Sequence, residues 1–285
     1  MKVYISLDME GVSGLVRWED VAGNGPEYTR GCRILTADLN AAIAGASDVG
    51  ADEVVVEENH GISELCNILM EEVDSRCQVV RGPGRPFATT MSALDSETLV
   101  VLLVGHHARA GSRPGIMAHT ISYRQFRSVS LNGREVGEPD LFAIRAGELG
   151  VPIGLITGDQ VVAEQVQALV PNVEVVVVKT ALSNRAGSCI PPARAQEMIR
   201  KGAESAVRRA VAGEFTPYVG DIAPYNIQVE LKNYMSEGLR QNLEAMPEFE
   251  IINSRVVRTQ ADDMGMGFRR IAYLSFGDRP GLKRY

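Results

Sequence analysis

Short runs of apolar residues in the first half of the chain predict buried strands. Val3 to Leu7, the EVVVE segment from Glu53 to Glu57, and Leu99 to Val104 are continuous rather than alternating. This pattern is typical of strands that are covered on both faces. Further apolar runs predict strands at 78–81, 152–156 and 173–179.

Between these runs, apolar residues recur at helical spacing. Helices are expected at 27–49, 63–73, 138–149 and 160–169, and Gly50 and Gly150 would close two of them. Strands that alternate with helices predict an α/β protein: a mostly parallel sheet with helices on both faces.

The pattern changes after Lys179. Small and turn residues fill 183–192, and a long helix is expected at 193–212. Polar residues then alternate with Ile227, Val229 and Leu231, which is typical of a half-buried strand. A short helix, strands near 249–252 and 255–258, and a final helix from 261 are expected to follow. We therefore predict an α/β domain at 1–180, with a hairpin at Asn132-Gly133, and a smaller α+β domain at 181–285.

Composition narrows the class of protein. The 285 residues suffice for one large or two modest domains, and 36 acidic against 29 basic residues give a formal net charge of −7. An acidic balance argues against a nucleic-acid-binding surface. No apolar run predicts a secretory signal or a membrane span. The four cysteines lie far apart, so we expect free thiols and a cytoplasmic setting.

Metal-capable residues follow three of the predicted strands. Asp8 and Glu10 come after the first, His60 after the EVVVE strand, and His107 after the 99–104 strand. Ligands of open parallel sheets bind outside the carboxyl ends of the strands, so these side chains are expected to converge. Carboxylate and imidazole donors suit zinc, manganese or cobalt, and four donors exceed the need of one catalytic zinc. Two metals that share a carboxylate would use the surplus.

From the residues alone, simpler interpretations stay open. An acidic residue after a strand is often a turn or cap residue, and a single histidine there is often just a satisfied polar group. His119 lies near enough in sequence to reach the same rim, or else it is a core histidine. Glu138 would begin a helix, where a carboxylate is favoured by the helix dipole in any case. Four further residues are expected beside the site or in solvent rather than as ligands: Glu57, Glu58, His106 and Arg109.

Several short motifs together resemble the D-aminopeptidase family, zinc peptidases named for a product of a bacterial dipeptide-transport operon. The motifs are VYISLDMEG from Val3, GHHARA from Gly105, PGIMAH from Pro114 and NGREVGE from Asn132, with Asn59-His60 between them. The resemblance covers most of the chain and is densest up to about residue 195.

This resemblance implies a dinuclear zinc site with Asp8, Glu10, His60, His107 and Glu138 as ligands, Asp8 bridging. It implies that His119 is a catalytic residue that does not bind metal. It also implies a ring-like homo-oligomer, a decamer, that releases N-terminal residues, mainly D-amino acids such as D-alanine, from short peptides by metal-activated water.

The chain departs from the family pattern beside the expected metals. Glu58 stands where a shorter Asp is expected, His106 where an aromatic residue is expected, and Pro139-Asp140 follows the ligand Glu138. These differences bear on substrate preference more than on metal binding. The alternatives are a metal-dependent amidohydrolase acting on another small amide, a non-catalytic α/β ligand-binding module, and a scaffold whose assembly is its function.

Overall fold

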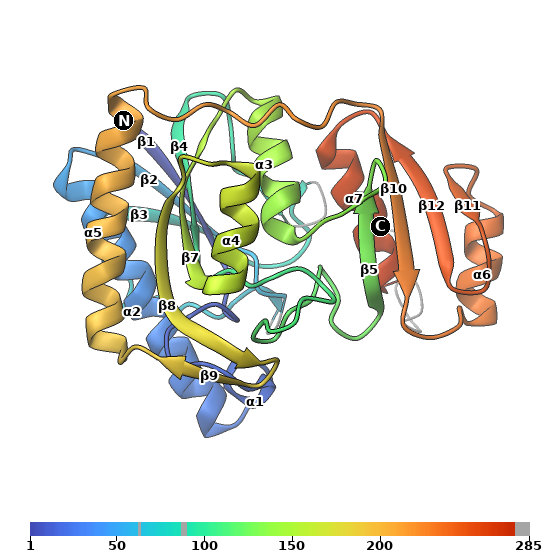
Figure 1. Ribbon diagram of the computed structural model, residues 1–285, viewed down its shortest axis with the longest axis horizontal. Helices are drawn as coiled ribbons and strands as arrows, with labels where there is room; N and C mark the ends of the chain where they lie inside the picture. Colours follow the sequence, from blue (N-terminus) through green and yellow to red (C-terminus); the bar gives the residue numbers. More distant parts are fainter. Residues whose placement is uncertain (62–63, 87–89, 277–285) are drawn as a thin grey trace.

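The computed structural model describes residues 1–61, 64–86 and 90–276, and it contains two sheets (Figure 1). The larger sheet has seven strands, and all but the last are parallel. Their order across the sheet is β3 (Cys77–Val80), β2 (Glu53–Glu58), β1 (Lys2–Leu7), β4 (Thr98–Val104), β7 (Ile153–Asp159), β8 (Glu174–Ser183) and the antiparallel β9 (Ala186–Cys189). The predicted mostly parallel sheet is confirmed.

Helices cover both faces of this sheet, as predicted. On one face, α2 (Pro26–Asp48) and α5 (Pro192–Val211) pack against each other and share one apolar cluster with alternate residues of β1. On the other face lie α3 (Glu138–Glu148) and α4 (Gln160–Leu169). Both faces of the strands are therefore apolar, which explains the continuous apolar runs in the sequence.

The second sheet is antiparallel. Its order is β11 (Phe249–Ile251), β12 (Val256–Ala261), β10 (Tyr225–Leu231), β5 (Phe126–Leu131) and β6 (Arg134–Glu135). Helix α7 (Met264–Phe276) packs on β10 and β12 and also contacts α3, while α6 (Glu237–Glu244) packs on β11. In β10, Ile227 and Val229 are buried and their neighbours are more exposed, so the alternating pattern is confirmed.

The two sheets do not divide the chain at one point. Hairpin β5–β6 comes before residue 180 but pairs with β10 of the second sheet. Helix α5 comes after residue 180 but packs on the first sheet. The boundary at 180 stays a prediction.

One predicted helix is wrong over its described part. Residues 64–73 form turns, while Ser63 lies outside the described residues. The Glu58 carboxylate accepts hydrogen bonds from the backbone N–H groups of Asn67 and Ile68, and Glu64 and Leu65 have positive φ angles. These bonds replace the helical ones, so the segment wraps around Glu58 instead of coiling. Strand β9 was also missed, because its small residues predicted only a loop.

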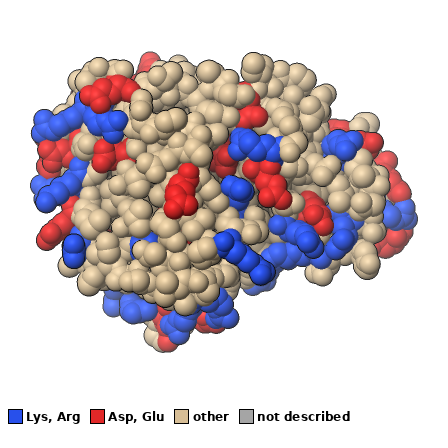
Figure 2. Space-filling model, viewed as in Figure 1, with Lys and Arg blue, Asp and Glu red and all other residues tan. Residues whose placement is uncertain are grey.

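Charged side chains of both signs lie side by side on the face shown in Figure 2. No helix in the described ranges is long and apolar enough to cross a membrane. All four cysteines are free thiols, as predicted: Cys32 is buried, Cys77 half-buried, and Cys66 and Cys189 exposed.

Candidate metal centre

The predicted ligands meet at the carboxyl ends of three neighbouring strands. Because β2, β1 and β4 are adjacent, the loops that leave them carry His60, Asp8 with Glu10, and His107 to one rim. The loop that follows His107 brings His119 to the same place, and the first residue of α3 contributes Glu138. All six side chains are buried.

Three of these residues form a first group of donors. The Nδ1 atom of His60 lies 2.9 Å from Oε2 of Glu10 and 3.4 Å from Oδ1 of Asp8. Their ligand atoms all lie within 4.8 Å of one another, close enough to hold one cation.

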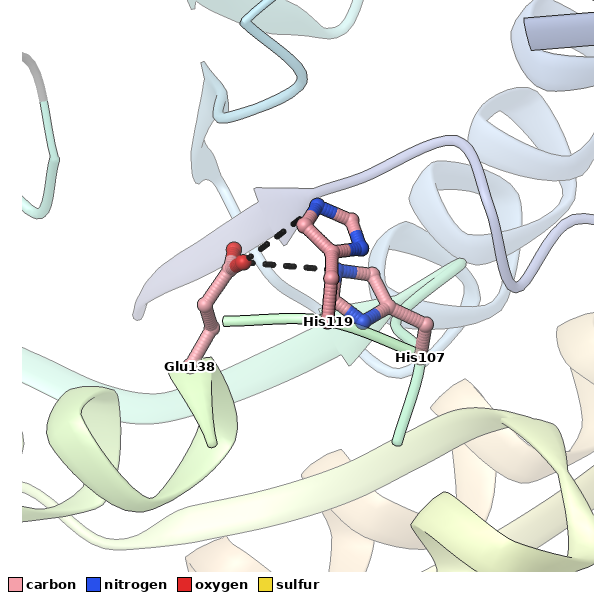
Figure 3. A group of neighbouring side chains, drawn as sticks. All are labelled: His107, His119 and Glu138. Carbon is pink, nitrogen blue, oxygen red and sulfur yellow. Dashed lines mark ion pairs between the residues drawn. The ribbon is translucent and has the colours of Figure 1, made fainter. Parts of the chain in front are cut away.

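The second group is His107, His119 and Glu138 (Figure 3). Oε1 of Glu138 lies 3.4 Å from Nε2 of His107 and 3.8 Å from Nε2 of His119. The two imidazole rings are stacked, with centroids 3.9 Å apart and an angle of 10° between the planes.

The Asp8 carboxylate belongs to the first group and also reaches the second. Its Oδ1 faces His60, and its Oδ2 lies 3.3 Å from Nε2 of His107. One carboxylate therefore presents one oxygen to each group, which is the arrangement that a bridging ligand requires.

Contacts with backbone carbonyls set which ring nitrogen each histidine presents to a metal. Nε2 of His60 lies 2.7 Å from the Val21 carbonyl oxygen, and Nδ1 of His107 lies 3.0 Å from that of Ala108. Nδ1 of His119 lies 2.9 Å from the Met117 carbonyl oxygen. An N–H donated to a carbonyl leaves the other nitrogen with a lone pair, and this is the support that metal-binding histidines usually have. In all three rings, that other nitrogen points at the carboxylates.

Unsatisfied polar atoms also fit a bound cation. Within the described part of the chain, Oδ2 of Asp8 and Nε2 of His107 are buried and have no hydrogen-bond partner, although they face each other. Burying such atoms without a partner costs about 1–3 kcal/mol each. A dication between them would satisfy both, so the donor set fits a metal such as zinc.

The pKa values of the site residues depend on the close pairs of histidines and carboxylates. Burial alone would raise the pKa of Asp8, but the His107 and His60 rings hold it well below its usual range. Burial would lower the pKa values of His60 and His107, but the adjacent carboxylates raise both well above 6.5. For His119, burial and the neighbouring His107 outweigh the carboxylates and lower the pKa.

Glycines let two of the ligand loops touch through their backbones. Gly105 has a φ of +73°, and a Cβ there would overlap the Asp8 carbonyl oxygen. A Cβ on Gly11 would likewise overlap the carbonyl oxygen of His106. The Gly11 N–H donates to the Gly105 carbonyl at 2.7 Å, so the loops after β1 and β4 are locked together.

A lysine that the sequence reasoning missed supports the first of these loops. Lys179 on β8 is 1% exposed, and its ammonium donates to the carbonyls of Glu10 (2.6 Å), Val12 (2.9 Å) and Leu15 (2.5 Å). Burial lowers its pKa to about 8. A lysine at the end of an apolar strand was the available signal, but its partners could not be read from the sequence.

The residues next to the predicted ligands have other tasks. The Asp140 carboxylate accepts from the Gly137 N–H at 2.8 Å, so Asp140 caps α3 and Glu138 is left to face the histidines. Glu58 is turned toward Asn67 and does not join either donor group. His106 lies beside Asp8, and Arg109 is half-buried outside both groups.

An aromatic wall, also missed from the sequence, stands next to His119. Trp18 of helix α1 (Trp18–Val21) stacks on Tyr123 with ring centroids 4.2 Å apart, and it packs edge to face with His119 with centroids 5.6 Å apart. Both rings are half-buried, so this wall is partly open to solvent where it contacts His119 of the second donor group.

Comparisons with known proteins point to one family of peptidases. The model of the peptidase M55 family, D-aminopeptidase, matches residues 1–272. A D-aminopeptidase from Bacillus subtilis (strain 168) is 33% identical over 265 residues, which is 93% of each chain. The solved structure of a zinc-dependent D-aminopeptidase from Bacillus subtilis, DppA, described as a self-compartmentalizing protease, superposes with a TM-score of 0.88 at 30% identity over the whole of both chains.

Proposed function

This chain belongs to the peptidase M55 family of D-aminopeptidases, and from that premise we propose that it holds two zinc ions and releases N-terminal D-amino acids from short peptides. One observation carries the metal assignment: the Asp8 carboxylate turns one oxygen to each of two buried donor groups. The similar Bacillus subtilis protein is zinc-dependent, which supports zinc as the metal.

We assign Asp8, Glu10 and His60 to one zinc and His107, Glu138 and the second oxygen of Asp8 to the other. Zinc, when bound, supplies Lewis acidity, which polarises a carbonyl and makes water a stronger nucleophile at neutral pH. The protein supplies the rest. Carbonyl-supported histidines and interlocked loops hold the donors in place, and burial excludes bulk water.

We propose that His119 is a catalytic residue rather than a ligand. Its Nε2 lies 3.9 Å from Glu10 and 3.8 Å from Glu138, so it faces both donor groups from one side. A neutral ring, which its lowered pKa favours, is able to accept a proton at Nε2 and return it to the leaving amine. Its geometry also suits a fourth ligand of the second zinc, and the next experiment separates the two roles.

We expect His119→Ala to keep two zinc ions per subunit and to lose about 10²–10⁴ in kcat, the usual contribution of a positioned acid–base group. Metal analysis and steady-state kinetics on the same preparation measure both quantities. A variant with one zinc per subunit would make His119 a ligand, and a variant with normal turnover would remove it from the mechanism.

The substrate class is tested with a panel of D- and L-aminoacyl dipeptides and amides. Each is assayed with protein stripped by a chelator and again after zinc is restored. We expect cleavage of D-alanyl dipeptides only with zinc present and only with a free amino end. Preferred cleavage of amides that lack an amino terminus would favour the alternative, a metal-dependent amidohydrolase, and full activity in metal-free protein would end the metal mechanism.

The similar self-compartmentalizing protease supports a homo-oligomer, and we propose a decamer. Sedimentation velocity tests this number, because a decamer of 30.9 kDa subunits is well separated from a dimer or a hexamer. We also propose a cytoplasmic setting, since the four cysteines are free thiols. Cell fractionation tests it.

A further inference from the structure

His106 is a buried histidine that belongs to neither donor group. It is fully buried, and its ring packs edge-on against Phe142 with centroids 5.4 Å apart. Its Nδ1 lies 3.7 Å from Oδ2 of Asp8, the oxygen that faces His107. Neither atom has a hydrogen-bond partner among the described residues. What His106 does to Asp8 depends on which of its nitrogens carries the proton.

The other ring nitrogen of His106, Nε2, contacts both the hydroxyl and the carbonyl of Ser6. Nε2 of His106 lies 3.0 Å from the Ser6 hydroxyl and 3.2 Å from the Ser6 carbonyl oxygen. If Nε2 carried the proton, it would donate to Ser6, and a bare Nδ1 would face the carboxylate. If Nε2 accepts from the hydroxyl, the proton is on Nδ1 and an N–H faces Asp8.

Asn59 decides between these two tautomers. Its amide nitrogen lies 2.7 Å from the Ser6 hydroxyl oxygen and 3.4 Å from the Glu57 carbonyl oxygen, so the nitrogen must be on this side. Its amide oxygen accepts from the Thr90 hydroxyl at 3.1 Å, which is compatible with this orientation, while the Glu57 carbonyl, which can only accept, selects it. Asn59 therefore donates to Ser6.

Because the Ser6 hydroxyl oxygen accepts from Asn59, the hydroxyl must donate its own proton to a different acceptor. Ser6 is fully buried, and Nε2 of His106 is the hydroxyl's remaining hydrogen-bond partner among the described residues. An unpaired buried hydroxyl costs about 1–3 kcal/mol, which is enough to select one tautomer. The bonds thus run in one direction, from Thr90 through Asn59 and Ser6 to His106.

We propose that this chain of hydrogen bonds holds His106 as the Nδ1–H tautomer and makes it a positioning residue for Asp8. At 3.7 Å the contact is longer than a hydrogen bond, so the N–H dipole acts on the carboxylate through a buried, low-dielectric space. The effect is to hold Oδ2 in the orientation that the shared ligand needs. The inference rests on the proposed function only in taking Asp8 as that shared ligand.

The first test reads the tautomer directly in metal-free protein. The chain has four histidines, so selective ¹⁵N labelling gives few ring signals, and loss of a signal in His106→Phe assigns this residue. We expect a protonated Nδ1 in the wild type. In Ser6→Ala we expect the proton on Nε2, where the carbonyl oxygen of residue 6 remains as acceptor. A protonated Nε2 in the wild type, or an unchanged tautomer in Ser6→Ala, would overturn the proposal.

The second test measures zinc affinity by competition with a chelator. Loss of a group that orients a metal ligand usually weakens binding about 10- to 100-fold, and we expect this for Ser6→Ala and His106→Phe. Ser205→Ala, which removes a hydroxyl bonded to Glu174 far from the site, is the control and should keep wild-type affinity. Wild-type affinity in Ser6→Ala would refute the positioning role. Absence of zinc binding by the wild type would instead refute the proposed function, while the tautomer experiment would still stand.

Discussion

Replacing Lys179 with methionine tests how the loop that carries Asp8 and Glu10 is held. Methionine fills a similar volume but cannot donate to the three carbonyls that Lys179 now satisfies. A buried acceptor without a donor costs about 1–3 kcal/mol, so three cost about 6 kcal/mol at the middle of that range. Against this, the variant no longer buries an ammonium.

The size of that offset follows from the pKa of Lys179, which burial lowers from 10.5 to about 8. Such a shift corresponds to about 3 kcal/mol against the charged form. The expected net loss in the free energy of unfolding is therefore about 3 kcal/mol. Zinc affinity should fall as well, because the backbone next to Glu10 loses its anchor.

Urea unfolding followed by circular dichroism measures the first quantity, and competition with a zinc chelator measures the second. Lys201→Met is the matched control, since Lys201 is exposed on α5 and its loss should change both by little. A Lys179→Met variant within about 0.5 kcal/mol of wild type, the usual range for surface substitutions, would refute the anchoring role.

Four other predictions follow from the site. Gly105→Ala should destabilise the protein by about 1–3 kcal/mol and weaken zinc binding, because alanine at this positive φ strains the backbone and meets Asp8; urea unfolding with wild-type stability would contradict this. Zinc binding should release protons, measurable with an indicator in weak buffer, because the pKa values of His60 and His107 are raised well above 6.5 in the metal-free protein. By the same linkage, His60 and His107 stabilise the metal-free protein fully below pH 6.5, and this stabilisation is lost as pH rises through their higher folded pKa values. A metal-free protein that becomes more stable over that range would oppose this. Trp18→Leu should cost about 0.5–1.5 kcal/mol through lost stacking on Tyr123 and should keep the wild-type zinc content, so a metal-depleted variant would count against a separate aromatic wall.

The sequence predicted the first sheet well because its strands are covered on both faces and therefore read as unbroken apolar runs. The convergence of Asp8, His60 and His107 followed from topology alone, since neighbouring parallel strands end at one rim. Glu138 and His119 needed the family resemblance, because a helix start and a loop histidine are ambiguous by themselves. Their presence at the rim agrees with that resemblance, while their roles stay proposals.

Other features of the structure could not be predicted from local patterns in the sequence. The segment 64–73 has helical residues, yet the buried Glu58 carboxylate captures the backbone N–H groups of Asn67 and Ile68, which lie 9 and 10 residues after it. Helix α5 has an apolar stripe that fits either sheet, and only the long-range packing on α2 assigns it to the first. Lys179 and the bonds between Asn59, Ser6 and His106 join residues up to 169 positions apart, and no short-range spacing encodes them.

The path of the chain between His119 and Glu138 couples the site to the smaller sheet. The backbone leaves the rim after His119, forms hairpin β5–β6 as part of that sheet, and returns at Glu138. The two ends of this excursion are residues of the second donor group, while Asp8, Glu10 and His60 lie on loops that leave strands of the larger sheet. The second donor group therefore lies where the path of the chain joins the two sheets, whereas the first donor group belongs to the larger sheet alone.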